Sequence, residues 1–101
     1  MSDEYAIYFI VKNNLSMGKG KIAGQVGHAM QYIMEDYMKG SINQYDYQSW
    51  KDSGHRKIVL KTDQNQLERL AKYKNSVAVH DAGKTQIPSN SLTVVAYYPM
   101  K

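Results

Sequence analysis

The segment YAIYFIVK, residues 5–12, decides the fold because it is apolar on both of its alternating faces. Successive side chains of a strand point to opposite sides of the sheet. A strand that is apolar on both sides needs cover on both. We therefore expect residues 5–12 to form a strand of a sheet that is covered on both faces.

The next part of the chain predicts two helices. After a turn at residues 13–16, apolar residues recur at helical spacing until Gly40 ends the pattern, and these are Ile22, Val26, Ala29, Met30, Ile33 and Tyr37. A weaker helix is expected over residues 41–52, ending at Gly54. Both helices therefore precede the second strand.

Three further segments predict strands, over residues 56–61, 76–80 and 91–98. A third helix is expected after the first of them, because Asp63 and Gln66 resemble a capping box. The resulting order is β-α-α-β-α-β-β. Helical crossovers imply parallel neighbours, and the last two strands have no helix between them. We therefore predict an α/β fold, a three-layer α/β/α sandwich with a mixed four-stranded sheet.

Composition narrows the class of protein. A chain of 101 residues is long enough for one domain, residues 1–101. It contains no cysteine, which excludes a disulfide framework and a thiolate metal site. No apolar stretch approaches the roughly 20 residues that span a bilayer, and the acidic start does not resemble a secretory signal. We expect a cytoplasmic protein with no membrane partner, whose net charge of +4 suits a polyanionic one.

The segment MGKGK, residues 17–21, predicts an anion site. It places Lys19 and Lys21 beside Gly18 and Gly20 at the start of a helix, where the backbone is already electropositive. A weaker interpretation is a nucleotide-binding loop, since the glycine spacing formally fits the dinucleotide fingerprint. The chain is short for that fold. Solvated lysines at a flexible helix start remain the simpler alternative.

A second polar segment follows the third strand. Asp81 comes directly after this apolar run, and Thr85 lies four residues later. Because sites in open α/β sheets form beyond the carboxyl ends of strands, we expect Lys19 and Asp81 to meet there. An ionised aspartate beside a hydroxyl orients water, and a lysine stabilises an oxyanion. This set suits hydrolysis of an acyl bond without a covalent intermediate, although Asp81 could instead cap a turn.

One polar face of the first helix adds candidates. Lys21, Gln25 and His28 recur at i, i+4 and i+7. His28 either contacts the site or bonds a neighbouring loop. The three histidines show no metal-ligand spacing, so we expect no metal.

Three motifs together carry a family resemblance. They are MGKGKIAGQVGHA at 17–29, W-x3-G-x3-IVLK at 50–61 and DAGKTQIP at 81–88. In this order they closely resemble the archaeal and eukaryotic type of peptidyl-tRNA hydrolase, and the resemblance runs from the first strand to Pro99. It implies hydrolysis of the ester between peptide and tRNA, with no metal or cofactor, by a protein that is commonly a homodimer on an α/β/α fold.

The resemblance also implies roles for single residues. The functional lysine, aspartate and threonine of the family match Lys19, Asp81 and Thr85, which we predict to be catalytic. The helix glutamine and histidine match Gln25 and His28. We expect substrate binding by residues of the glycine loop, the helix face and the last motif, namely Gly18, Gly20, Lys21, Gln25, His28 and Lys84.

Some positions depart from the family pattern. Lys84 replaces the usual arginine, which keeps the charge but loses the planar fork for phosphate. Gly24 and Gly27 replace the usual alanine and serine and should weaken the helix. The chain between Leu70 and Asp81 looks shorter by roughly a helical turn. No candidate catalytic group is lost, which favours a hydrolase over a non-catalytic RNA-binding or protein-interaction module on the same fold.

Overall fold

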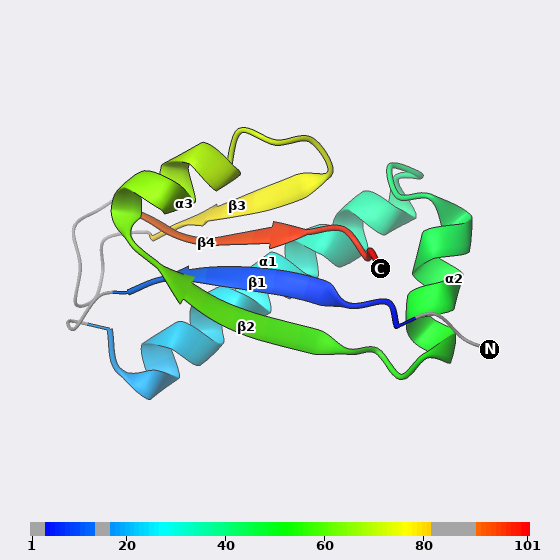
Figure 1. Cartoon of the computed structure of the whole chain (residues 1–101), viewed down its shortest axis with the longest axis horizontal. Coiled ribbons are helices and arrows are strands. Elements are labelled where there is room, and N and C mark those ends of the chain that lie inside the picture. The colour runs from blue at the N-terminus through cyan, green and yellow to red at the C-terminus, as the bar shows by residue number, and fades with distance from the viewer. Residues whose placement is uncertain (1–3, 14–16, 82–90) are drawn as a thin grey trace.

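A mixed four-stranded sheet forms the centre of the protein, with helices on both of its faces (Figure 1). The structure is a computed structural model that describes residues 4–13, 17–81 and 91–101. The elements in chain order are β1 (Ile7–Lys12), α1 (Lys19–Met38), α2 (Gln44–Asp52), β2 (Lys57–Thr62), α3 (Gln64–Leu70), β3 (Ser76–His80) and β4 (Leu92–Tyr97). The predicted order of elements is confirmed.

The sheet has the strand order β2-β1-β4-β3. β1 and β2 are parallel neighbours, joined by the crossover that contains α1 and α2. β4 runs antiparallel to both β1 and β3. The predicted mixed sheet is therefore confirmed, and β4 is its antiparallel strand.

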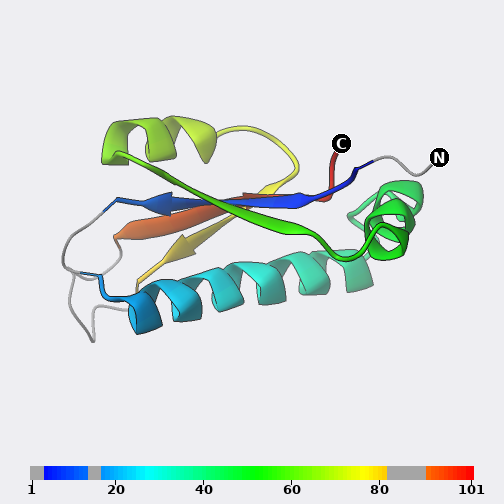
Figure 2. The same cartoon turned by 60° about the horizontal axis from the view of Figure 1, so that its bottom comes forward.

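The two faces of the sheet carry separate apolar cores. α1 lies along one face and α3 along the other, as Figure 2 shows from the side. On β1, Ile7, Phe9 and Val11 face the α1 layer, whereas Ile10 packs with Leu67 of α3. The strand that looked apolar on both faces is thus covered on both, which confirms the three layers.

Side-chain caps mark the starts of two of the three described helices. Asp63 caps α3 by accepting a hydrogen bond of 2.8 Å from the Gln66 backbone N–H, as its spacing predicted. Asn43 caps α2 in the same way, accepting from the Asp46 N–H at 3.0 Å. α2 therefore begins at Gln44 rather than at residue 41. α1 has no such cap, because Gly18 occupies that position.

Cover is thinnest over β2, which lies at an edge of the sheet. Its Val59 and Leu60 are 51% and 47% exposed. α1 contacts β1, β3 and β4 more extensively than it contacts β2, and α3 contacts β1 and β4 more extensively than β2. Among the described helices, none is long and apolar enough to cross a membrane.

Candidate active site

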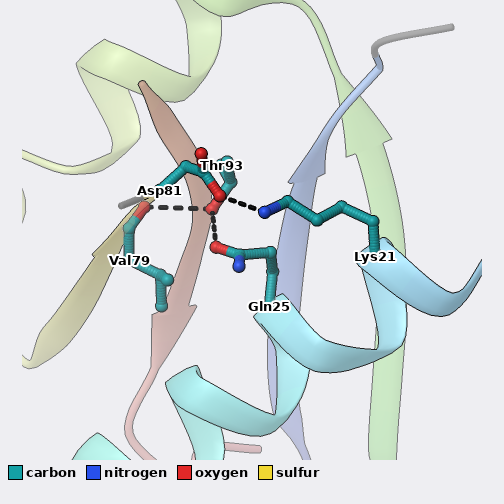
Figure 3. Close-up of polar contacts among 5 residues, drawn as sticks. All are labelled: Lys21, Gln25, Val79, Asp81 and Thr93. Carbon is teal, nitrogen blue, oxygen red and sulfur yellow. Dashed lines mark hydrogen bonds and ion pairs between the residues drawn. The ribbon is translucent and has the colours of Figure 1, made fainter. Parts of the chain in front are cut away.

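Four polar side chains from three parts of the fold meet at the carboxyl end of β3 (Figure 3). Lys21 and Gln25 come from the first two turns of α1, Asp81 directly follows β3, and Thr93 lies on β4. The Lys21 Nζ forms an ion pair with the Asp81 Oδ1. The Thr93 hydroxyl donates to the Gln25 Oε1 at 2.7 Å, with the Val79 carbonyl oxygen 3.1 Å away.

These groups are unusual in being polar and buried. Asp81, Gln25 and Thr93 are 2%, 6% and 0% exposed, and they are the buried polar residues of the described part of the chain. Burying a polar group costs free energy unless a hydrogen bond or charge partner replaces water. The contacts within the cluster provide such partners. The Asp81 backbone N–H also donates to the Ser91 carbonyl at 2.8 Å, which ties the end of β3 to the start of β4.

The lysine that pairs with Asp81 is Lys21, and the expected pairing with Lys19 is wrong. Lys21 and Gln25 are four residues apart, so they share one side of α1. Lys19 precedes Lys21 by two residues, which turns its side chain about 200° around the helix axis. Lys19 is accordingly exposed while Lys21 is half-buried. The spacing of Lys21 with Gln25 was the signal in the sequence for the correct partner.

The two glycines of the loop stand at the open start of α1. Gly18 directly precedes the helix, and its carbonyl accepts from the Ile22 N–H at 3.0 Å. Both Gly18 and Gly20 are exposed, and a Cβ added at either would meet no described atom within 4 Å. The packing of the described residues therefore does not require glycine at these positions.

The other predicted residues are placed less fully. His28 is exposed on the same side of α1 as Lys21 and Gln25. Lys84 and Thr85 lie outside the described residues, so the expectations for them stay predictions. Thr93 was not among the residues singled out from the sequence. The only hint was a hydroxyl within the otherwise apolar start of LTVVAY, residues 92–97.

The chemistry of this cluster is that of an ionised carboxylate held by an ammonium group. Such a carboxylate can orient a water molecule or accept its proton. In the described part of the chain, no group of three or more histidine, aspartate or glutamate side chains is placed to hold a metal ion. A cavity of about 270 Å³ lies at the opposite end of the sheet, lined by residues that include Ile42, Asn75 and Tyr98. It contains no predicted site residue.

Comparison with known proteins assigns the family. Residues 5–101 match the family described as "Peptidyl-tRNA hydrolase PTH2". A Drosophila melanogaster protein named "Probable peptidyl-tRNA hydrolase 2" is 34% identical over 98% of this chain and 55% of its own length. A Saccharomyces cerevisiae "Peptidyl-tRNA hydrolase 2" is 32% identical over 95% of this chain and 51% of its own length.

An archaeal relative matches over more of its own length. The "Peptidyl-tRNA hydrolase" of Sulfolobus acidocaldarius is 37% identical over 89% of this chain and 82% of its own length. The chain thus spans about half the length of the two eukaryotic relatives and most of the archaeal one. The family match runs from just before β1 to the end of the chain and includes every described residue of the buried polar cluster. The chain belongs to the peptidyl-tRNA hydrolase PTH2 family.

Proposed function

We propose that this protein hydrolyses the ester bond that joins a peptide to the terminal ribose of tRNA, and so returns the tRNA for reuse. The observation that carries this proposal is the buried Asp81, held by Lys21 and next to Gln25 on α1. It occurs in a chain whose family and relatives carry this activity in their names. A carboxylate held in this way is suited to activating water.

The reaction balances with the residues of the chain and one water molecule. Asp81 orients the water and accepts its proton as the oxygen bonds to the ester carbonyl carbon. Lys19, exposed at the start of α1, adds positive charge at this end of the sheet, which favours the negative charge that develops on the carbonyl oxygen. The bond from that carbon to the ribose oxygen then breaks, and the proton held by Asp81 passes to the ribose oxygen. Lys21 keeps Asp81 ionised and in place before each turnover.

The remaining predicted residues bind substrate. Gly18 and Gly20 let the RNA backbone approach the first N–H groups of α1, which favour anions. Lys84 contacts phosphate as a point charge, and His28 extends the polar side of α1. Thr85 orients the water or the Asp81 carboxylate.

The location, oligomeric state and cofactor requirement that we propose follow from the family resemblance. We propose that the protein acts in the cytoplasm as a homodimer, without metal or cofactor. The exposed Val59 and Leu60 on the edge strand β2 are apolar surface that a second copy could cover. Size-exclusion chromatography with light scattering tests the dimer, and a monomer at assay concentration would contradict it.

A single-turnover assay tests the activity. Excess protein is mixed with N-acetylated aminoacyl-tRNA, and release of the blocked amino acid is followed with time. We expect rapid release by the wild type and a loss on the order of a hundredfold or more for Asp81→Asn, because the general base is lost. Lys51→Ala serves as the control, because Lys51 is an exposed lysine on α2, away from the cluster. Release unchanged in Asp81→Asn would contradict the role of the carboxylate, and tRNA binding without release would favour a non-catalytic RNA-binding protein.

A further inference from the structure

Thr93 occupies an irregular position in the sheet. Between β3 and β4 the pairing is Val79 with Val94 and then His80 with Leu92, so Thr93 is the extra residue of a bulge. A bulge turns side chains out of their regular alternation. Here Leu92 and Val95 pack in the α3 layer and Val94 in the α1 layer. Thr93 also reaches α1, although regular alternation would turn neighbouring residues to opposite faces.

The bulge brings a fully buried hydroxyl to Gln25. The Thr93 Oγ1 lies 2.7 Å from the Gln25 Oε1 and 3.1 Å from the Val79 carbonyl oxygen. A hydroxyl carries one hydrogen, so it can donate fully to only one of these oxygens. The shorter distance identifies Gln25 as the main acceptor. In this arrangement the amide oxygen of Gln25, and not its NH2 group, faces β4.

The other end of the amide is left for a different partner. Gln25 is only 6% exposed, yet none of the described residues accepts a hydrogen bond from its Nε2. Figure 3 shows the Gln25 Oε1 turned to Thr93 and the Nε2 turned away from it, on a residue that lies next to the pair of Lys21 and Asp81. The Nε2 is not among the buried side-chain atoms without a partner in the described part of the chain, so its two N–H groups remain within reach of water or a ligand.

We propose that Thr93 is a positioning residue, whose hydroxyl holds the Gln25 amide so that its NH2 group donates to the carbonyl oxygen of the substrate ester. This inference rests on the proposed function. The hydroxyl itself does not touch the substrate. It acts by removing the reverse orientation of the amide, in which the Gln25 carbonyl would face the ester oxygen and repel the negative charge that develops there.

Four variants test the proposal in single-turnover assays at saturating protein. Thr93→Val keeps the shape of the side chain and removes the hydroxyl, and we expect the rate to fall about tenfold or more. Thr93→Ser keeps the hydroxyl and should stay near the wild-type rate. Gln25→Ala should be at least as slow as Thr93→Val. Gln25→Glu keeps an acceptor for Thr93 but offers no N–H, so it should be as slow as Gln25→Ala.

The double variant separates positioning from a merely structural role. If Thr93 acts through Gln25, then Thr93→Val adds no further loss to Gln25→Ala. A further loss in the double variant, a wild-type rate in Thr93→Val, or a wild-type rate in Gln25→Glu would each overturn the proposal. An inactive wild type would instead contradict the proposed function, because these comparisons need an active protein.

A measurement without substrate covers the case in which Thr93→Val does not fold. In the wild type, NMR reports whether the Gln25 side-chain amide protons or the Gln25 carbonyl lies next to Thr93. We expect the Thr93 hydroxyl proton to exchange slowly with water. We also expect a scalar coupling across the hydrogen bond between this proton and the Gln25 side-chain carbonyl carbon. Strong Overhauser effects from the Gln25 NH2 protons to the Thr93 side chain would show the reverse orientation and overturn the proposal.

Discussion

At the scale of the residue, two lysines separated by one glycine have different surroundings. Lys21 is half-buried and paired with Asp81, whereas Lys19 is exposed and turned about 200° away on α1. The sequence predicted that a lysine meets Asp81 but named Lys19, because sheet topology brings both lysines to the same edge. Helical geometry decides between them, and the spacing of Lys21 with Gln25 already contained that information.

A double-mutant cycle tests this difference. We expect Lys21→Ala and Asp81→Asn each to lower the single-turnover rate, on the order of a hundredfold for Asp81→Asn. Because the two groups act as one ion pair, the variant with both changes should be about as slow as the slower single variant. Lys19→Ala is the matched comparison. Its proposed role at the oxyanion is separate from that of Asp81. The fold-decrease in rate of the variant with both Lys19→Ala and Asp81→Asn should therefore equal the product of the two single fold-decreases.

Two results would contradict this assignment. A wild-type rate for Lys21→Ala would mean that the ion pair with Asp81 has no part in the reaction. Non-additivity of Lys19→Ala with Asp81→Asn, together with additivity for Lys21→Ala, would return the pairing role to Lys19. Urea unfolding of each variant shows whether a lost rate comes from a lost fold.

At the scale of the element, the strands were predicted more accurately than the details of their pairing. Apolar runs located β1 to β4 to within one or two residues, because buried strands appear in a sequence as short runs of apolar residues. The bulge at Thr93 has no comparable pattern in the sequence. It arises from the way β3 and β4 pair. A buried hydroxyl at this position is explained by its hydrogen bond to Gln25 of α1, which the sequence of the strand does not reveal.

A contact between α1 and the end of β4 predicts a dependence of stability on pH. The Tyr98 hydroxyl donates to the Asp36 Oδ2 at 2.7 Å. Burial, and then the hydrogen bond and charge of Asp36, raise the pKa of Tyr98 to about 12. Because this pKa lies above the ordinary value of about 10, the stabilising contribution is complete below pH 10 and is lost as the pH rises through 12.

Urea unfolding of the wild type and Tyr98→Phe measures this contribution. At neutral pH the wild type should have the higher urea midpoint, because the variant leaves the half-buried Asp36 carboxylate without its hydrogen-bond donor. The difference between the two midpoints should shrink as the pH passes from about 10 to about 12. Burial also raises the pKa of Tyr97, but this tyrosine is present in both proteins and does not alter the comparison. A difference that is independent of pH would show that the hydroxyl contributes only by packing.

At the scale of the whole molecule, one end of the sheet combines the buried cluster with positive charge. Lys12 ends β1, Lys61 lies near the end of β2, and Lys19 begins α1. All three stand toward the carboxyl ends of the parallel strands, as does Asp81. The molecule is 42 Å long, several times the Debye length of about 8 Å at physiological salt. Charges at the far end around α2 therefore have little influence on an anion bound at this end.

The fold and the place of the site were predictable for a common reason. A chain of 101 residues with alternating strands and helices has few ways to cover an apolar strand on both faces. Once the order of elements is known, the carboxyl edge is the place for polar loops. The partner of Asp81 and the role of Thr93 depend on side-chain directions within a few ångströms, which topology does not specify.

The charge at this end predicts how tRNA binding depends on salt. If the proposed function holds, each lysine–phosphate contact releases condensed counterions, so the affinity should fall steeply as salt increases. Lys19→Ala should lower the slope of log affinity against log salt by about 0.7–0.9, the range for one contact with single- or double-stranded nucleic acid. Lys51→Ala, on exposed α2, removes the same charge from the far end and should leave the slope unchanged. Filter binding of uncharged tRNA over a series of salt concentrations gives both slopes. A wild-type slope near zero, or equal changes in the two variants, would mean that tRNA is not held by the charged end that surrounds Asp81.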